Sequence, residues 1–576
     1  MARSTRAFAI GLAFTMMMAA CAPSAGESRS GGGSAGTGQV QSASTPKRLT
    51  AAIRGLAVVA YQKLNPRSNI PGEDSLERLA ASGLTVPALD GNGRLPRLAD
   101  AAPTVDNGNW KLLPDGTMET RWTIKDGARW SDGTPITTDD LLFTMQVVRD
   151  KELPIFDHAA YASLGSVETI NNRTVVAHWT KTYIYADQLF SFEIALPFPK
   201  HKLEQAYLND KEHFTDNPGW GPEMVGSGPF KVKDWQLGSL VVFEANDQYI
   251  LGRPKIDEIT VKFIPDPNTL AANILAGAVD TTWGGRTDIE WAQEVYGKWQ
   301  DGKLDTYTSL MLQIYPQMIG STPAVISQSA DFRRALTMAL DRQAMADTFQ
   351  LGRSSVGHTF LAPSEPEYQF IEPAIVKYAY DPQRSLQILQ GLGYTRGTDG
   401  ALRDASGQQL SFQVRTSQGD VTQEKAMQAS ADDWQRLGAE VERFLVPPQR
   451  ANDAEFRATF PSFDVKRQAG TMDYAKSFLT RAIALPTNNF LASGNNSRYS
   501  RPEMDAAINN YYTTVPWDER MEYARQVVHE LSDDAAWIGL YYVVEPGLVP
   551  NKLTNLRAGR AEVNRLDFIH EWDIQR

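Results

Sequence analysis

The side chains most suited to catalysis are scattered through this chain without the spacing that catalysis requires. Seven of the 576 residues are histidines, spread from His158 to His570, and no two of them stand at the spacing of a metal-ligand pair. The sequence has no G-x-x-x-x-G-K-[ST] phosphate loop and no H-E-x-x-H motif. Its one G-x-S-x-G string, 32–36, lies in the Ser/Gly-rich N-terminal stretch and not between a strand and a helix, so it is no nucleophile elbow, and Ser227 lies between glycines at the wrong spacing for a nucleophile. We therefore expect no enzymatic activity, no catalytic residue, no metal site and no cofactor.

Adjacent carboxylates are the remaining candidates for acid–base chemistry. Asp432-Asp433 and Asp533-Asp534 are neighbours in sequence, so their side chains point apart on a helix, and we interpret them as solvated charges. Another stretch contains three carboxylates: Asp132, Asp139 and Asp140. Asp132 with the glycine after it fits a turn, and Asp140 fits the capping box of a helix, so we predict structural roles rather than a metal site.

The elements that would position a binding site are clearest in residues 226–280. A glycine-rich turn leads into a strand, and the segments 239–244 and 258–264 follow as a strand pair, the second with the alternating pattern of a half-buried strand. Asp266 is placed to cap a helix that begins at Pro267, where the missing N–H of proline does no harm.

Strands and helices alternate through much of the remaining chain, which favours an α/β fold. The expected strands are 49–53, 122–124, a hairpin over 167–179, 410–414, 440–444 and the buried 537–544. The expected helices include 76–79, one starting at Thr137, 331–342, one opening at Tyr380, one ending at Leu437, one with a capping box at Ser500–Glu503, and 517–531.

The N-terminus carries a targeting signal. Arg3 and Arg6 precede an uncharged run that ends at Ala20, which is the length of a signal-peptide core and too short for a membrane span. Cys21, the only cysteine, follows directly, and Met18–Cys21 resembles a bacterial lipobox. We predict a signal peptide over 1–20, lipidation at Cys21, and a flexible Ser/Gly-rich tether over 21–47.

Composition and charge exclude several other classes of protein. Hydrophobic residues make up 42% and charged residues 22% of the sequence, as is ordinary for a soluble globular protein. The formal net charge of −11 argues against a nucleic-acid partner, because such a protein needs a concentrated basic face. No stretch after the N-terminal signal has the roughly 18–20 apolar residues of a membrane span.

An ordered series of motifs resembles the bacterial extracellular solute-binding proteins of family 5, the peptide and nickel receptors of ABC importers. The series comprises GSGPFKVKDW from Gly226, IPDPNTLAANILAGAVD from Ile264, GARWSDGTPITTDDLLF from Gly127, and the RxALxxAxDR-like helix at 331–342. The resemblance extends over nearly all residues from about 48 to 576. It implies an α/β, two-lobed periplasmic-binding-protein fold (type II, cluster C-like) with a small additional domain inserted in the first lobe.

The same resemblance implies domain boundaries. Lobe I is expected to combine 48–82, 196–284 and 541–576, with the inserted domain at 83–195 and lobe II at 285–540. Two strand crossings, near residues 281–284 and near Tyr541, would form the hinge between the lobes.

The walls of an interlobe cleft are the expected ligand site. The candidates are Asn69, Gly72, Trp283, Gly470, Thr471, Asp473, Tyr541 and Tyr542. In peptide receptors of the family an aspartate in the loop matching 463–479 pairs with the α-ammonium of the ligand. Here Thr471 stands at that position and Gln468 at the position of a tryptophan, and Asp473 could substitute only if the loop is reshaped.

The resemblance implies a substrate-binding protein of an ABC importer that closes on a peptide or peptide-like solute and delivers it to a membrane permease. We expect a monomer, anchored through lipidated Cys21 on the periplasmic side or the outer face of the bacterial cell membrane. The alternative is an envelope assembly or regulatory lipoprotein that uses the same fold to bind partner proteins.

Overall fold

The computed structural model describes residues 45–61, 70, 72–91, 93–153, 158–284, 287–450, 453–490, 495, 497–557, 559 and 563–575. The predicted signal peptide, Cys21, nearly all of the tether and Asn69 lie outside these residues. Within them, no helix has the length and apolar character needed to cross a membrane.

Lobe I is built on a five-stranded sheet with the strand order β11-β1-β10-β9-β8. Its strands are β1 (Arg48–Ile53), β8 (Phe230–Gln236), β9 (Leu240–Ala245), β10 (Glu258–Phe263) and β11 (Thr281–Thr282). β1 runs parallel to both β10 and β11, whereas β8, β9 and β10 are antiparallel. The predicted strand pair and the following helix α4 (Pro267–Leu275) are confirmed, and the Asp266 carboxylate caps α4 by accepting from the Thr269 N–H at 2.7 Å.

The inserted domain carries a four-stranded antiparallel sheet with the order β4-β5-β7-β6. The elements in and beside it are β2 (Thr85–Pro87), β3 (Arg94–Pro96), β4 (Trp110–Leu112), β5 (Met118–Thr123), α2 (Thr138–Val148), β6 (Leu164–Asn171), β7 (Thr174–Trp179) and α3 (Lys200–Asn209). The capping box of Thr137 and Asp140 on α2 is confirmed. One apolar cluster includes Trp122 and Trp179 of this sheet together with Leu49 and Phe243 of lobe I, so the two share a core.

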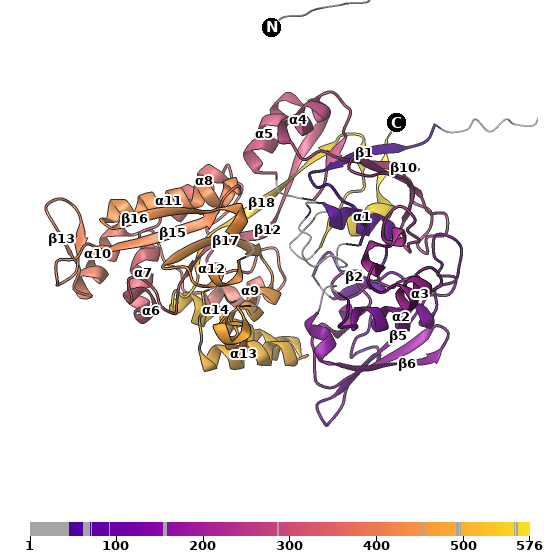
Figure 1. The fold of residues 1–576 in the computed structure, drawn as a ribbon, viewed down its shortest axis with the longest axis horizontal. Helices are drawn as coiled ribbons and strands as arrows, with labels where there is room; N and C mark the ends of the chain where they lie inside the picture. Colours follow the sequence, from indigo (N-terminus) through magenta and orange to yellow (C-terminus); the bar gives the residue numbers. More distant parts are fainter. Residues whose placement is uncertain are drawn as a thin grey trace, which may run out of the picture. The chain divides into compact units, whose positions relative to one another are not determined.

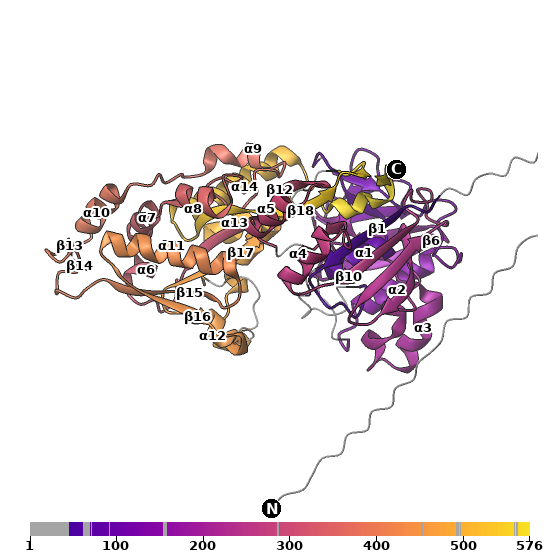
Figure 2. The same ribbon diagram turned by 90° about the horizontal axis from the view of Figure 1, so that it is seen from above.

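Lobe II is built on a second five-stranded sheet with the order β16-β15-β17-β12-β18. Its strands are β12 (Gly302–Pro316), β15 (Ser411–Ser417), β16 (Glu440–Val446), β17 (Phe463–Ala469) and β18 (Ile538–Pro550), and β13 (Thr395–Arg396) and β14 (Leu402–Arg403) form a separate hairpin. The helices are α6 (Val325–Gln328), α7 (Ala330–Met338), α8 (Arg342–Phe349), α9 (Tyr368–Ile371), α10 (Pro382–Gly391), α11 (Val421–Leu437), α12 (Ala454–Ala458), α13 (Pro502–Thr513) and α14 (Trp517–Asp533). Figure 2 shows α11 lying along the sheet beside β15.

Two long strands link the lobes. β12 and β18 run side by side between the lobes (Figure 1) and pair antiparallel over most of their length. All 13 residues of β18 are buried. At the lobe I end of β18 the carbonyl of Leu548 accepts a hydrogen bond of 2.7 Å from the Thr281 hydroxyl. α5 (Ile289–Lys298) packs there too, since Val295 shares an apolar cluster with Leu270 of α4. The predicted boundary at residue 284 stays a prediction.

The remaining elements complete lobe I. They are α1 (Glu73–Ala80), β19 (Leu553–Thr554) and β20 (Asp573–Ile574). α1 contains the segment 76–79 that was predicted to be helical.

Three local predictions are wrong. The helix expected over 331–342 breaks after Met338, because Asp341 caps the new helix α8 by accepting from the Ala344 N–H. The capping box expected at Ser500–Glu503 is absent: Arg501 occupies the N-cap of α13 without a side-chain cap, and the Ser500 hydroxyl lies 2.8 Å from that of Thr480.

The third wrong prediction concerns the adjacent carboxylates. Asp433 and Asp534 are both only 5% exposed instead of solvated. Asp433 accepts a hydrogen bond from the Asp341 N–H, and Asp534 forms an ion pair with Arg333 at 2.7 Å. Asp534 therefore has a buried charged partner distant in sequence, whereas Asp433 pairs with Arg436, three residues along the same helix.

Candidate ligand-binding site

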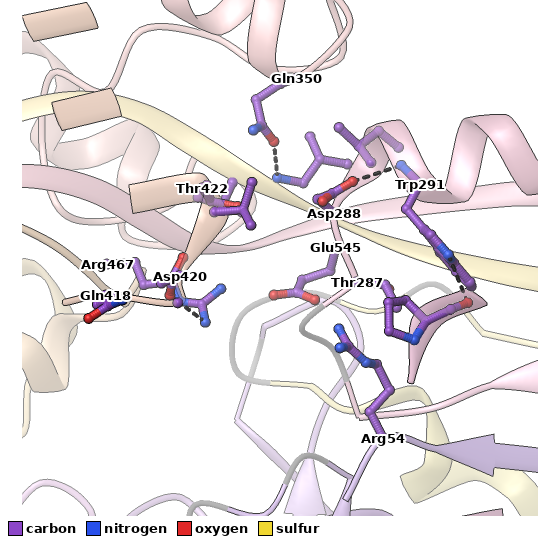
Figure 3. A pocket seen from close by; sticks show the side chains of 16 residues that line it. Arg54, Thr287, Asp288, Trp291, Gln350, Gln418, Asp420, Thr422, Arg467 and Glu545 are labelled. Atoms are coloured by element: carbon purple, nitrogen blue, oxygen red, sulfur yellow. Dashed lines mark hydrogen bonds and ion pairs between the residues drawn. The ribbon is translucent and has the colours of Figure 1, made fainter. Parts of the chain in front are cut away.

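A cavity of about 500 Å³ lies where the two lobes and the linking strands meet. Its lining combines lobe I residues, the start of α5, the start of α11 and the middle of β18 (Figure 3). The lining includes Arg54, Pro267, Asp288, Trp291, Gln350, Gln418, Asp420, Thr422, Arg467 and Glu545. This volume falls within the range of about 300–1,000 Å³ typical of small-molecule sites.

Glu545 occupies a central place in this cavity. It lies on β18 opposite Tyr307 of β12 and is only 8% exposed. Figure 3 shows its carboxylate directed into the cavity between the labelled side chains of Arg467 and Arg54. Burial, with a contribution from the Glu545 charge, raises the pKa of the Tyr307 hydroxyl to about 12. A buried carboxylate at this position is suited to a cationic group of a ligand.

The other lining carboxylates are engaged in local structure. Asp288 caps α5 by accepting from the Trp291 N–H at 2.7 Å. Asp420 caps α11 and also forms an ion pair with Arg467 at 2.9 Å. Arg54 donates from Nε to the Pro265 carbonyl at 3.2 Å, and its side chain lines the cavity (Figure 3). The cavity thus presents both signs of charge, as a zwitterionic solute would require.

A family model described as bacterial extracellular solute-binding proteins, family 5, middle, matches residues 103–482, which is more than half of the chain. The chain belongs to this family. The description of the family places its members outside the cytoplasm and gives them a solute-binding role.

Two curated relatives are similar to this family-5 protein over different shares of their length. The oligopeptide-binding protein AppA of Bacillus subtilis (strain 168) is 28% identical over 334 residues, which cover 58% of this chain and 59% of AppA. The nickel-binding periplasmic protein of Escherichia coli (strain K12) is 23% identical over 490 residues, covering 83% and 87% of the two chains. The match to AppA thus spans less than two thirds of that relative.

Solved structures confirm the predicted two-lobed α/β fold of this family-5 protein. Bacillus subtilis AppA in complex with a nonapeptide superimposes with a TM-score of 0.68 at 22% identity, covering 92% of this chain and 100% of AppA. NikZ from Campylobacter jejuni in complex with Ni(L-His) superimposes with a TM-score of 0.71 at 18% identity, with the same coverage. At these identities the likeness establishes the fold of the family-5 chain and nothing finer.

Two of the predicted cleft residues, Trp283 and Gly72, lie close together in lobe I. Trp283 is 7% exposed and lines a second cavity of about 230 Å³, which shares Glu545 with the first. Gly72 adopts a left-handed conformation with φ of +89°, and a Cβ there would lie 2.5 Å from Ile53 Cγ2 and 3.4 Å from the Trp283 carbonyl oxygen. Gly72 therefore permits the close approach of the chain to Ile53 of β1, next to the backbone of Trp283.

Gly470, Thr471 and Asp473 lie elsewhere, where lobe II contacts the inserted domain. Gly470 accepts a backbone hydrogen bond of 2.8 Å from Ala362, and Thr471 precedes a short 3₁₀ helix over 472–478. The Asp473 side chain is 59% exposed and forms an ion pair with Lys476. These residues do not appear in the lining of the 500 Å³ cavity. As ligand contacts they stay predictions.

Tyr541 and Tyr542 are packed inside lobe II. They point to opposite faces of the sheet, because consecutive strand residues alternate, and they enter two different apolar clusters. The Tyr542 hydroxyl donates toward the carbonyls of Thr359 and Leu361, at 3.0 and 2.9 Å. Neither tyrosine belongs to the lining of the 500 Å³ cavity. Their predicted role in binding stays a prediction too.

Sequence reasoning missed Glu545, although a signal was present. Glu545 is the sole charged residue between Trp537 and Pro550, and it directly follows the predicted buried strand 537–544. A lone acid beside such a strand is a signal in itself, since burying a charged group is costly.

Proposed function

We propose that this chain is the substrate-binding protein of an ABC importer and takes a peptide or peptide-like solute into the cavity around Glu545. Membership of family 5 supports a solute-binding role, and the relatives named above include both an oligopeptide-binding and a nickel-binding protein. The single observation that favours a peptide is a cavity lined by both lobes in which Glu545 lies between two arginines.

Charge complementarity defines how such a solute would bind. The ammonium group of a short peptide would pair with the Glu545 carboxylate, and its carboxylate or carbonyl oxygens would accept from Arg54 or Arg467. A buried ammonium without such a partner costs several kcal/mol, so an acid has to be present. Glu545 thereby takes the role that the family resemblance assigns to the position of Thr471.

Hinge closure is the proposed mechanism. Arg54 belongs to lobe I and Arg467 to lobe II, so a solute that contacts both gains those contacts only when the lobes are together. A ligand with this differential affinity shifts the population toward the closed form. The closed pair of lobes would then be the surface that a membrane permease recognises.

Calorimetry with trialanine and N-acetyl-trialanine tests the proposal. We expect trialanine to bind more tightly, and Glu545→Gln to weaken it by about 10–100-fold, because removing one partner of a buried charge pair leaves the other uncompensated. Glu440→Gln, at an exposed position of β16, is the matched control and should keep the affinity.

Three outcomes contradict this assignment in different ways. Equal affinity of the two peptides, or of the wild type and Glu545→Gln, would remove Glu545 from the site. Binding of a Ni(II)–histidine complex without binding of alanine peptides would move the solute class from peptides to metal chelates. Co-purification of a protein instead of a small molecule would favour the envelope-assembly alternative.

The proposal includes a location. We propose that lipidated Cys21 anchors a monomeric binding protein to the cell membrane, with residues 21–47 as a tether. The lipobox-like motif Met18–Cys21 at the end of the uncharged run supports the anchor. A tethered receptor stays close to its permease while it is free to rotate.

A further inference from the structure

The inserted domain and lobe II touch directly, apart from the strands that link the lobes. The contact involves residues 183–187, which follow β7, and residues 472–476 of lobe II together with Tyr512 of α13. The Ile184 N–H donates a hydrogen bond of 3.3 Å to the Tyr512 carbonyl. We call these three segments the interlobe latch.

Ile184 is the apolar centre of the latch. It belongs by sequence to the inserted domain, yet its side chain is 4% exposed and lies in the apolar cluster of lobe II that contains Met472, Tyr474 and Tyr512. A side chain that crosses from one lobe into the core of the other is buried only while the lobes are together. Its burial therefore favours the closed arrangement over any open one.

Lys476 adds a polar part to the latch. Its ammonium lies 4.5 Å from the centre of the Tyr512 ring and 5.4 Å from the centre of the Tyr185 ring, so it bridges a ring of each lobe. The two rings are themselves 5.8 Å apart, and Lys476 is held in place by its ion pair with Asp473. Cation–π contacts of this kind attract across the interface and depend on both rings being present.

None of these contacts requires a solute. We propose that the interlobe latch closes the lobes in the absence of ligand, so that the unliganded protein already populates the closed form. This inference rests on the two-lobed, hinge-closing mechanism proposed above. Asp473 is then part of the closing contact through its ion pair with Lys476.

Ile184→Ala is the variant that tests the latch. It removes three of the four side-chain carbons, which lowers the ratio of closed to open molecules by roughly 30-fold, equivalent to about 2 kcal/mol at 1.4 kcal/mol per tenfold. Ile170→Ala is the matched control, because Ile170 is 54% exposed on β6 of the same domain. Lys476→Met serves as a second variant, since it keeps the length of the side chain and removes the charge.

Small-angle scattering of the unliganded protein gives the readout. We expect a larger radius of gyration for Ile184→Ala and Lys476→Met than for the wild type and Ile170→Ala, with the melting temperatures of all four within a few degrees. The inference is overturned if both latch variants have the same radius of gyration as the wild type, whether all three are compact or all three are extended. Because no solute is added, these results are independent of the calorimetry that tests Glu545.

Discussion

The most direct test of how lobe II is held together is the substitution of Arg333 by leucine. Arg333 lies on α7 and is 2% exposed, and its guanidinium reaches across to the end of α14. It donates to the Asp534 carboxylate at 2.7 Å, to the Asp534 carbonyl at 3.0 Å and to the Ile326 carbonyl at 2.8 Å. Burial lowers the pKa of Arg333 and the Asp534 charge opposes that effect, so the arginine is stabilised mainly by these contacts.

The size of the effect follows from the geometry. Removing one partner of a buried ion pair costs about 3–5 kcal/mol. We expect the lower end, about 3 kcal/mol, because Asp534 keeps a second ion pair with Arg501 at 3.1 Å. Arg334, the next residue, supplies the control for burial: its side chain is 27% exposed, it pairs with the exposed carboxylates of Asp331 and Asp533, and it donates to the Asp533 carbonyl at 2.7 Å. Because these pairs are exposed to solvent, Arg334→Leu should cost clearly less than Arg333→Leu, on the order of 1 kcal/mol.

Urea unfolding followed by circular dichroism measures both variants. The double variant Arg333→Leu/Asp534→Asn should lose less than the sum of the two single variants, since their energies are coupled through one contact. Equal losses for Arg333→Leu and Arg334→Leu would refute the reasoning, because burial of the pair would then have no energetic consequence. Additive losses in the double variant would show that the two side chains do not interact.

Two further predictions concern pH and location. Burial raises the pKa of Asp187 to about 6, so this carboxyl stabilises the folded state at low pH and loses that contribution as the pH rises through 6. The melting temperature of Asp187→Asn should therefore rise relative to that of the wild type between pH 4 and pH 7. A difference in melting temperature that stays constant over this range would contradict the prediction. Cys21→Ser should release the protein from host membranes into the soluble fraction after gentle fractionation, and retention of the variant would contradict lipid anchoring.

Much of lobe I could be predicted because its signals are local. Asp266 and the proline after it start α4, and the alternation in 258–264 marks β10; each signal lies within a few residues of the element that it specifies. The capping box of α2 is read equally directly from Thr137 and Asp140. Such patterns also carry the family resemblance, which is why the two-lobed fold was predictable.

The failures share the opposite property. Asp534 was read as solvated because its partner Arg333 lies 201 residues away in sequence. Glu545 was overlooked because its surroundings come from β12, α11 and lobe I together, and no single stretch of sequence displays them. The surroundings of Asp473 were equally hidden, because its ion-pair partner Lys476 lies over the ring of Tyr185, which is far from it in sequence.

Glu545 occupies a place from which ligand binding and closure can be coupled. β18, which carries it, pairs with β12 in the lobe II sheet, and three residues after Glu545 the Leu548 carbonyl is bonded to Thr281 of lobe I. A ligand held by Glu545 therefore contacts an element fixed to both lobes, and contacts with Arg54 and Arg467 add a preference for the closed form. If the latch already supplies part of that preference, the solute has to supply less, and its apparent affinity rises in proportion to the closed fraction. Solute affinity should then fall in Ile184→Ala although Ile184 lies outside the cavity lining.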